Sequence, residues 1–225
     1  MFPFPFSFIS GVVPDVPVEQ IANAEAMSFN GVDAYIDLSN LDQTILNSSF
    51  TVCFWLNKKA KVAGSDNDRI IDFTVNSGTS LQIITDAATN KFGVYFKQSN
   101  TTYINQQVFN SWNTVTNSWH HMSLTWDGSS YAYYFDGSPI SSTGTSSIGI
   151  SGAGFYIGKR ADNAGTTQFK GELDEVAIFN TALSSEKITQ IYDATAVVGG
   201  VPQTANLFTG GLSSSLVYWN RMGDS

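Results

Sequence analysis

The feature that most constrains the fold is a run of short segments in which apolar and polar residues alternate, separated by clusters of Gly, Asn, Asp and Ser. Segments of this length and period are typical of β-strands that bury one face. The strand candidates are residues 50–56, 69–75, 80–85, 92–97, 120–126, 155–158 and 171–179. Asp127-Gly128, between two alternating segments, predicts a tight antiparallel hairpin. The sequence therefore predicts an all-β protein.

Two segments depart from simple alternation. Residues 50–56 are mostly apolar at both odd and even positions, which predicts a strand covered on both faces. One short helix is predicted near the C-terminal end, with Ser184 as its N-cap and Ile191 on its buried face. Leu183 before the cap and Ile188 after it form a hydrophobic staple in this prediction.

Composition limits the classes of partner. The net charge of −8 repels a phosphate backbone, so we expect no binding to nucleic acid. No apolar run reaches the roughly 20 residues that a membrane helix needs, which predicts no membrane insertion. The single cysteine, Cys53, excludes a disulfide within the chain. Packing must therefore supply the stability, and a bound metal stays open as a second source.

The ends of the chain differ from its middle. Residues 1–22 are predicted to be an extended arm because prolines alternate with apolar residues there. Residues 23–196 form the predicted domain, and residues 197–225 are predicted to be a linker and an apolar tail. The N-terminus lacks a basic region before its apolar residues, so we expect no signal peptide. Candidate assembly anchors in the two ends are Phe2, Phe4, Phe6, Phe8 and Trp219.

An ordered set of short motifs spans about Met27 to Ala194. The motifs are Phe29-Asn30-Gly31, Tyr35-Ile36, Phe50-Thr51-Val52-Cys53-Phe54-Trp55, Trp119-His120-His121-Met122, Tyr134-Phe135-Asp136-Gly137, Ile157-Gly158, Gly171-Glu172-Leu173-Asp174-Glu175-Val176 and Ala182-Leu183-Ser184. In order and spacing this set resembles the laminin-G-like, concanavalin-A-like lectin/glucanase domains. The resemblance implies an antiparallel two-sheet jelly-roll sandwich with one short C-terminal helix. It also implies glycan or protein ligands at the rim loops or the concave face.

The same superfamily includes glycoside hydrolases that carry three acids on one strand. Glu172, Asp174 and Glu175 resemble that pattern, but Val176 and Ala177 occupy the positions where the third acid should fall. In a regular strand Glu175 would point away from the other two acids. Because retaining hydrolysis needs two carboxyl groups about 5 Å apart across the sugar, we expect no catalytic activity.

Calcium is the cofactor that the resemblance implies. In related domains a structural calcium joins the first turn to the strand with the Gly-x-x-Asp-Glu motif, which implies Asn30, Asp33 and Asp174 as ligands here. Two roles for Asp174 stay open, namely calcium ligand and acceptor for loop amides. Asp66 and Asp68, in a Gly- and Asn-containing loop, are a second candidate for a cation.

Aromatic residues in polar loops are candidates for glycan binding. An aromatic ring can cover the apolar face of a sugar while neighbouring Asn and Asp side chains bind its hydroxyl groups. Tyr103, Trp112 and Tyr131 lie in or beside such sequence. Packing in the core or at its rim is the alternative role for each of the three.

These observations lead to two hypotheses. The first is a non-enzymatic virion protein, a capsid decoration or tail component of a bacteriophage, because similar domains occur in phage structural proteins, marine ones in particular. Its partners would be other virion proteins, bound through the terminal arms, and host-surface glycans, and exposed apolar arms predict a homo-oligomer. The alternative is an extracellular carbohydrate-binding or adhesion module.

Overall fold

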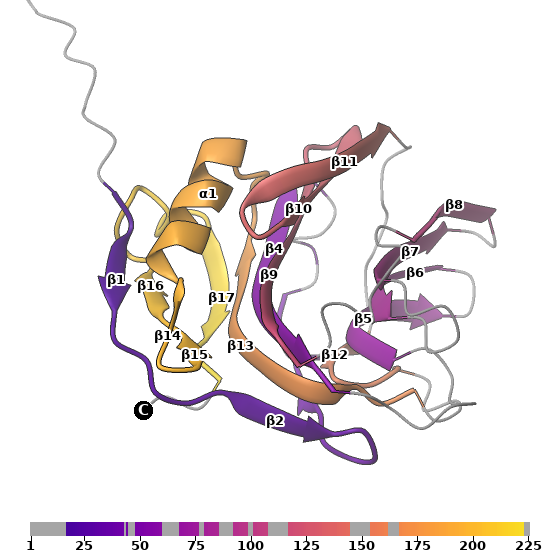
Figure 1. The fold of residues 1–225 in the computed structure, drawn as a ribbon. Helices are drawn as coiled ribbons and strands as arrows, with labels where there is room; N and C mark the ends of the chain where they lie inside the picture. Colours follow the sequence, from indigo (N-terminus) through magenta and orange to yellow (C-terminus); the bar gives the residue numbers. More distant parts are fainter. Residues whose placement is uncertain are drawn as a thin grey trace, which may run out of the picture.

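The computed structural model describes residues 17–42, 44, 48–59, 68–76, 79–85, 92–98, 101–107, 117–144, 154–161 and 167–222. In this part of the chain, two antiparallel sheets pack face to face, and a single helix, α1 (Ser185–Ala194), lies on the outer side of the larger sheet (Figure 1). The predicted all-β sandwich with one short helix is therefore confirmed.

The larger sheet has seven strands in the described part. They are β2 (Met27–Asn30), β4 (Phe50–Lys58), β9 (Trp119–Trp126), β10 (Ser130–Phe135), β11 (Ser138–Gly144), β13 (Lys170–Phe179) and β17 (Leu216–Asn220). Their order is β11-β10-β9-β4-β13-β17, and β2 pairs with the first half of β13. The predicted hairpin at Asp127-Gly128 is present as the β9–β10 connection, with a positive φ at Gly128.

The smaller sheet has six strands among the described residues. They are β3 (Ile36–Asp37), β5 (Asp68–Asn76), β6 (Thr79–Thr85), β7 (Phe92–Gln98), β8 (Thr101–Gln107) and β12 (Gly154–Ile157), in the order β3-β12-β5-β6-β7-β8. All the described pairings between these strands are antiparallel.

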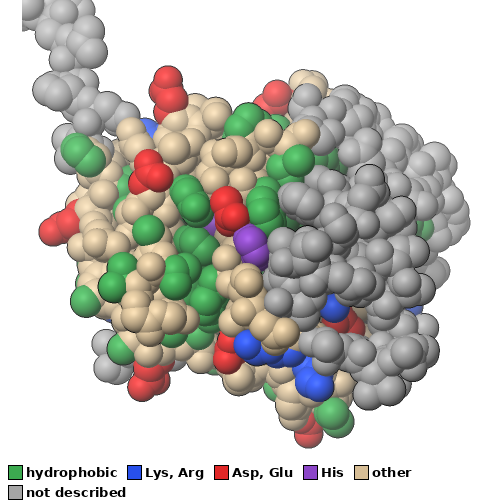
Figure 2. Space-filling model, viewed as in Figure 1, with side chains coloured by type: hydrophobic (Ala, Val, Ile, Leu, Met, Phe, Trp, Pro, Cys, Tyr) green, Lys and Arg blue, Asp and Glu red, His purple; other side chains and the backbone are tan. Residues whose placement is uncertain are grey.

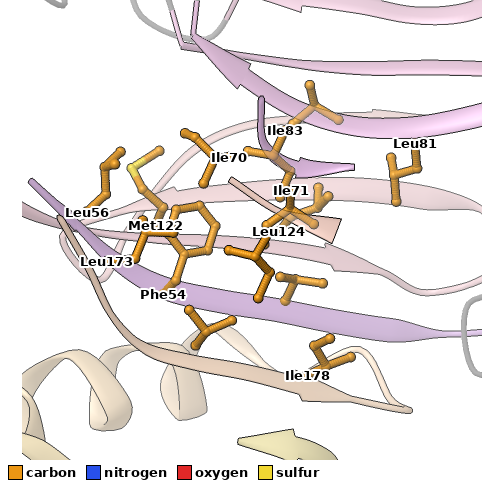
Figure 3. Close-up of a cluster of buried hydrophobic side chains, with 14 of the residues drawn as sticks. Phe54, Leu56, Ile70, Ile71, Leu81, Ile83, Met122, Leu124, Leu173 and Ile178 are labelled. Atoms are coloured by element: carbon orange, nitrogen blue, oxygen red, sulfur yellow. The ribbon is translucent and has the colours of Figure 1, made fainter. Parts of the chain in front are cut away.

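The main core lies between the two sheets. Figure 3 shows Phe54, Leu56, Met122, Leu124, Leu173 and Ile178 of the larger sheet near Ile70, Ile71, Leu81 and Ile83 of the smaller one. Each of these side chains is at most 2% exposed. Burial of this much apolar surface is the main stabilising contribution in a sandwich of two sheets.

A second apolar cluster covers the outer face of the larger sheet. Cys53, Ala177 and Phe179 of that sheet pack with Ile188 and Ile191 of α1. All nine residues of β4 are consequently buried, as the apolar residues on both faces of this segment predict.

The start of α1 also follows the prediction. Ser184 has extended backbone, and its hydroxyl accepts a hydrogen bond from the Lys187 amide at 3.3 Å. Leu183 and Ile188 belong to the same buried cluster.

Replacing Ser184 with Ala is expected to lower the free energy of unfolding by about 1 kcal/mol, because an amide at the helix start loses its acceptor. Urea unfolding of the two proteins measures this difference. Ser185→Ala is the control, since Ser185 is the next residue and has an exposed side chain. Equal losses in both variants would contradict the capping role.

The structure corrects the predicted domain boundaries at both ends. β1 (Glu19–Ile21), placed in the arm, pairs with β16 (Thr204–Asn206), placed in the tail. β14 (Val197–Val198) and β15 (Val201–Pro202) form a hairpin, and β17 pairs with the second half of β13. The described residues of both ends are thus part of the domain, because they cover the apolar outer face of the larger sheet.

Candidate functional site

The outer face of the smaller sheet carries polar and aromatic side chains. Successive residues of a strand point to opposite faces. Apolar neighbours such as Phe73, Leu81, Val94 and Phe155 point into the core. The side chains that point outward are therefore Asp72 on β5, Gln82 on β6, Tyr95 on β7 and Tyr156 on β12.

These outward residues stand in register across the sheet. Asp37 pairs with Tyr156, Tyr156 with Asp72, Asp72 with Gln82, and Gln82 with Tyr95. We call these five residues the outer row. Neighbouring strands are about 4.8 Å apart, so roughly 14 Å separates the backbones at Tyr156 and Tyr95. The outer row thus runs perpendicular to the strands, with an aromatic ring on each side of its centre.

Hydrogen bonds hold the centre of the outer row. The Thr74 hydroxyl donates to Asp72 Oδ1, and Gln82 Nε2 donates to Thr74 Oγ1 at 3.3 Å. The Nε atom of Arg69 lies 3.9 Å from Asp72 Oδ2. Asp72 and Gln82 are buried, whereas the two tyrosines are half-buried. The polar centre of the row is therefore buried and held in place, and the rings on either side of it are the accessible groups.

The end of the outer row at β3 is the most open part. Tyr35 is 49% exposed, and its ring lies edge-on to Tyr156 with 6.1 Å between centroids. Lys159 Nζ lies 3.7 Å from the Tyr35 centroid and 4.3 Å from that of Tyr156. Hydrogen bonds from Ser39 lower the pKa of the exposed Asp37 carboxyl, which keeps it ionised. This end combines two aromatic rings, one cation and one carboxylate.

Of the three aromatic residues proposed from the sequence for glycan binding, Tyr131 is the one whose side chain lies in the described part of the chain. Tyr131 is 0% exposed, and its ring packs in the core against Trp126 and Phe50, with centroids 4.4 and 6.4 Å away. It cannot stack on a sugar, so the prediction is wrong for this residue. Tyr103 belongs to β8, but its side chain lies outside the described parts, and Trp112 lies wholly outside them.

Sequence reasoning missed Tyr95 and Tyr156. The signal was present in the alternation, since Tyr95 follows Val94 and Tyr156 stands between Phe155 and Ile157. If those apolar residues face the core, both tyrosines must face outward.

A bulge in β13 changes the side of the strand on which one of its three acids lies. Register with β4 shifts between Asp174 and Ala177, and Glu175 has a φ of 50°, so the strand contains a bulge there. The bulge places Glu175 on the outer side with Asp174, which corrects the expectation that it points the other way. Glu172 binds Asn57 Nδ2 at 2.9 Å and Lys59 Nζ at 3.3 Å.

The implied calcium ligands fall into two separate places. Asn30 Oδ1 accepts hydrogen bonds from the amides of residues 32, 33 and 34, and Asn30 Nδ2 donates to Asp33 Oδ1 at 2.7 Å. Asn30 pairs with Lys170, four residues before Asp174 on β13, which is about 13 Å along the strand. The structure therefore does not bring Asp174 together with the other two.

The second cation candidate is only partly within the described residues. Asp66 lies outside them, and Asp68 is buried in β5. Over the described ranges, no group of three or more His, Cys, Asp or Glu residues is placed to hold a metal ion.

The adjacent histidines point to opposite faces of β9, as alternation predicts. His120 Nδ1 lies 2.9 Å from Asp136 Oδ2, and its ring stacks on Phe135. His121 is buried on the other face, and burial lowers its pKa to about 4 although the Asp136 carboxylate opposes this shift. In Figure 2, histidine atoms reach the surface near the centre of the view, next to acidic and hydrophobic side chains.

Cys53 is a buried structural residue. Burial, reinforced by the negative charge of Glu175, raises the pKa of its thiol to about 12. A thiol in this environment is not a nucleophile at neutral pH, because the thiolate is the reactive form.

The two antiparallel sheets and their packing define a sandwich of the jelly-roll class. Residues 30–189 match the profile of the Concanavalin A-like lectin/glucanases superfamily. The match covers most of the chain, so this protein belongs to that superfamily, as the ordered motifs predict. A search of the curated proteins found no match.

Solved structures with the same fold include carbohydrate-binding domains. Domain 4 of AbnA, an extracellular arabinanase from Geobacillus stearothermophilus solved with arabinotriose, is similar at 18% identity and a TM-score of 0.60, covering 80% of this chain and 81% of that one. A putative carbohydrate-binding protein from Bacteroides ovatus has 16% identity and a TM-score of 0.59; the match covers 92% of this chain but only 53% of that protein. The carbohydrate-binding module CBM40 of the Ruminococcus gnavus IT-sialidase has 11% identity and a TM-score of 0.55, over 77% and 96% of the two chains. At these identities the likeness shows the fold.

The one described helix is too short and too polar to cross a membrane.

Proposed function

We propose that this chain is a non-catalytic carbohydrate-binding module whose glycan lies across the outer row. The observation that carries the proposal is the register that aligns Tyr156, Asp72, Gln82 and Tyr95 across four adjacent strands. Sugar rings have apolar faces that stack on aromatic rings and hydroxyl groups that need hydrogen-bond partners. Two accessible rings, held at a fixed spacing by the buried polar centre between them, suit stacking on such a ligand.

The end of the outer row at β3 is the part of the site that a ligand would contact first. Tyr35 and Tyr156 offer ring surface, and the ionised Asp37 offers acceptor oxygens to hydroxyl groups. Lys159 fixes both rings through its position between them, so little ordering is needed on binding. The relatives of the same fold support this proposal, since one was solved with arabinotriose. An extracellular location follows from it as a further proposal.

The partners and the burial of the three acids of β13 support binding without catalysis. Glu172 is paired with Lys59 and Asn57, while Asp174 and Glu175 are buried under the terminal segments. None of the three is placed beside the outer row, since β13 belongs to the other sheet.

Tyr156→Ala is expected to weaken glycan binding at least tenfold, about 1.4 kcal/mol, because the ring shared by the outer row and its open end is lost. A glycan array that includes arabino-oligosaccharides identifies the ligand, and calorimetry measures its affinity. Phe208→Ala is the matched control, since Phe208 is an exposed aromatic residue that contacts Trp219 on the larger sheet. No binding on the array, or equal affinity in Tyr156→Ala, would overturn the proposal.

A second proposal is that residues 1–16 attach the domain to an assembly such as a virion. Phe2, Phe4, Phe6 and Phe8 are the anchors in this proposal and lie outside the described residues. The residues that follow this segment belong to the domain, since β1 pairs with β16 and the Glu19 amide donates to Thr209 Oγ1. Trp219 packs within the domain instead, where its Nε1 donates to Glu175 Oε2 at 3.0 Å.

Deleting residues 1–16 is expected to convert an oligomer into a folded monomer if these anchors join copies of the chain. If they bind other virion proteins, the deletion is expected to prevent incorporation into particles. Light scattering after size-exclusion chromatography gives the masses of both proteins. A monomeric full-length chain would count against self-assembly through this segment, and unchanged incorporation into particles would count against the virion role.

A further inference from the structure

Asp174 and Glu175 are two consecutive carboxylates buried beneath the terminal segments. The bulge in β13 turns both side chains away from the core, since Leu173 before them and Val176 after them both lie between the sheets. Asp174 is 0% exposed and Glu175 is 5% exposed. Two adjacent buried negative charges need strong compensation, because burial of a charge without partners costs several kcal/mol.

All four carboxylate oxygens accept hydrogen bonds from the chain itself. Asp174 Oδ2 accepts from Asn23 Nδ2 at 2.8 Å, and its Oδ1 accepts from the Glu175 amide at 2.8 Å. Glu175 Oε1 accepts from Thr204 Oγ1 at 2.6 Å, and its Oε2 accepts from Trp219 Nε1 at 3.0 Å. One of these four donors, the Glu175 amide, belongs to β13 itself, and the other three come from the segment before β2, from β16 and from β17.

The surrounding groups extend this network. The Asn23 amide donates to Gln203 Oε1, and Gln203 Nε2 donates to the Asn23 carbonyl, both at 3.3 Å. Arg221 Nε donates to Thr204 Oγ1 at 3.3 Å, which brings a positive charge close to the carboxylates. The two ends of the chain are thereby bound to each other as well as to β13.

The chemistry of these partners does not suit calcium. Calcium takes six to eight oxygen ligands, whereas the carboxylates here face the N–H groups of Asn23, Trp219 and the Glu175 amide. An N–H group presents the positive end of its dipole and cannot ligate a cation. The nearby Arg221 charge adds repulsion. A calcium ion would have to displace these donors and leave them buried without acceptors.

We infer that Asp174 and Glu175 form a metal-independent clasp that closes the N-terminal and C-terminal segments onto the larger sheet. The position for which the family resemblance implied a calcium ion is filled by donors of the chain. Folding of this domain therefore does not require calcium at Asp174.

The first test compares melting temperatures of the full-length protein in excess calcium and in excess EDTA. The difference between the two conditions is expected to be the same in the wild type, in Asp174→Asn and in Glu172→Gln, the control carboxylate two positions earlier. The inference is overturned if calcium raises the melting temperature of the wild type and of Glu172→Gln while Asp174→Asn loses that rise.

The second test uses milder changes, in case Asp174→Asn does not fold. Asn23→Ala and Trp219→Phe each remove one donor and are expected to lower the melting temperature by about 2–4 °C, equally in calcium and in EDTA. Limited proteolysis should then cut residues 201–222 faster than in the wild type. Melting and cleavage identical to those of the wild type would overturn the clasp.

Discussion

Deleting residues 199–225 is expected to abolish cooperative folding, although residues 1–198 contain the whole segment that matches the superfamily profile. The deleted part supplies Ala205, Leu207 and Leu212 to the cluster on the outer face of the larger sheet. It also supplies Met222 to the core between the sheets. Removing it therefore opens both apolar clusters at once.

The magnitudes support complete unfolding of the truncated chain. Truncating one buried Leu or Met to Ala costs about 2–5 kcal/mol, and a whole domain is stable by only about 5–15 kcal/mol. The deletion also removes β17 from β13 and takes Thr204 and Trp219 away from Glu175. The summed loss exceeds the stability of an ordinary domain.

Thermal unfolding followed by near-UV circular dichroism measures this effect. Leu207→Ala tests a single buried contact of the segment and should melt cooperatively at a lower temperature. Ser213→Ala is the control, because Ser213 is exposed. A truncated chain that melts cooperatively near the temperature of the full-length protein would show that the C-terminal segment is dispensable.

The sequence predicts local features of this fold well. The local pattern identifies β4, β5, β6, β7, β9, β12 and β13. Asp127-Gly128 identifies a hairpin, and Ser184 identifies the start of α1. Each of these signals lies within a few neighbouring residues, so tertiary structure is not needed to read it.

Features that depend on distant contacts are not visible in the sequence. β17 has the composition of an apolar tail, and only its pairing with β13 makes it a strand of the domain. The bulge at Asp174 and Glu175 depends on donors from both ends of the chain. For the candidate site, alternation could have identified Tyr95 and Tyr156. Their alignment with Asp72 and Gln82 depends on a register that only the folded sheet sets.

Acidification from pH 7 to pH 5 is expected to remove about 2 kcal/mol of stability through His121 alone. This side chain is 1% exposed and packs against Trp55 and Tyr192, with ring centroids 5.5 and 5.9 Å away. Because burial lowers its pKa from 6.5 to about 4, the folded protein keeps the ring neutral in this range. The unfolded chain binds a proton as the pH falls below 6.5, so unfolding becomes more favourable.

The stabilisation from the neutral His121 ring is complete above pH 6.5, and it decreases until the folded state also takes up the proton near pH 4. Urea unfolding at pH 7 and pH 5 measures the change, and His121→Gln, which carries no titratable group, should lose most of it. Other titrating groups cancel in this comparison, since they are present in both proteins. Ser123→Ala, two residues away on the same face of β9, is the control and should keep the full pH dependence. Equal pH dependence in the wild type and in His121→Gln would mean that this histidine is not buried as the packing of α1 on the sheet requires.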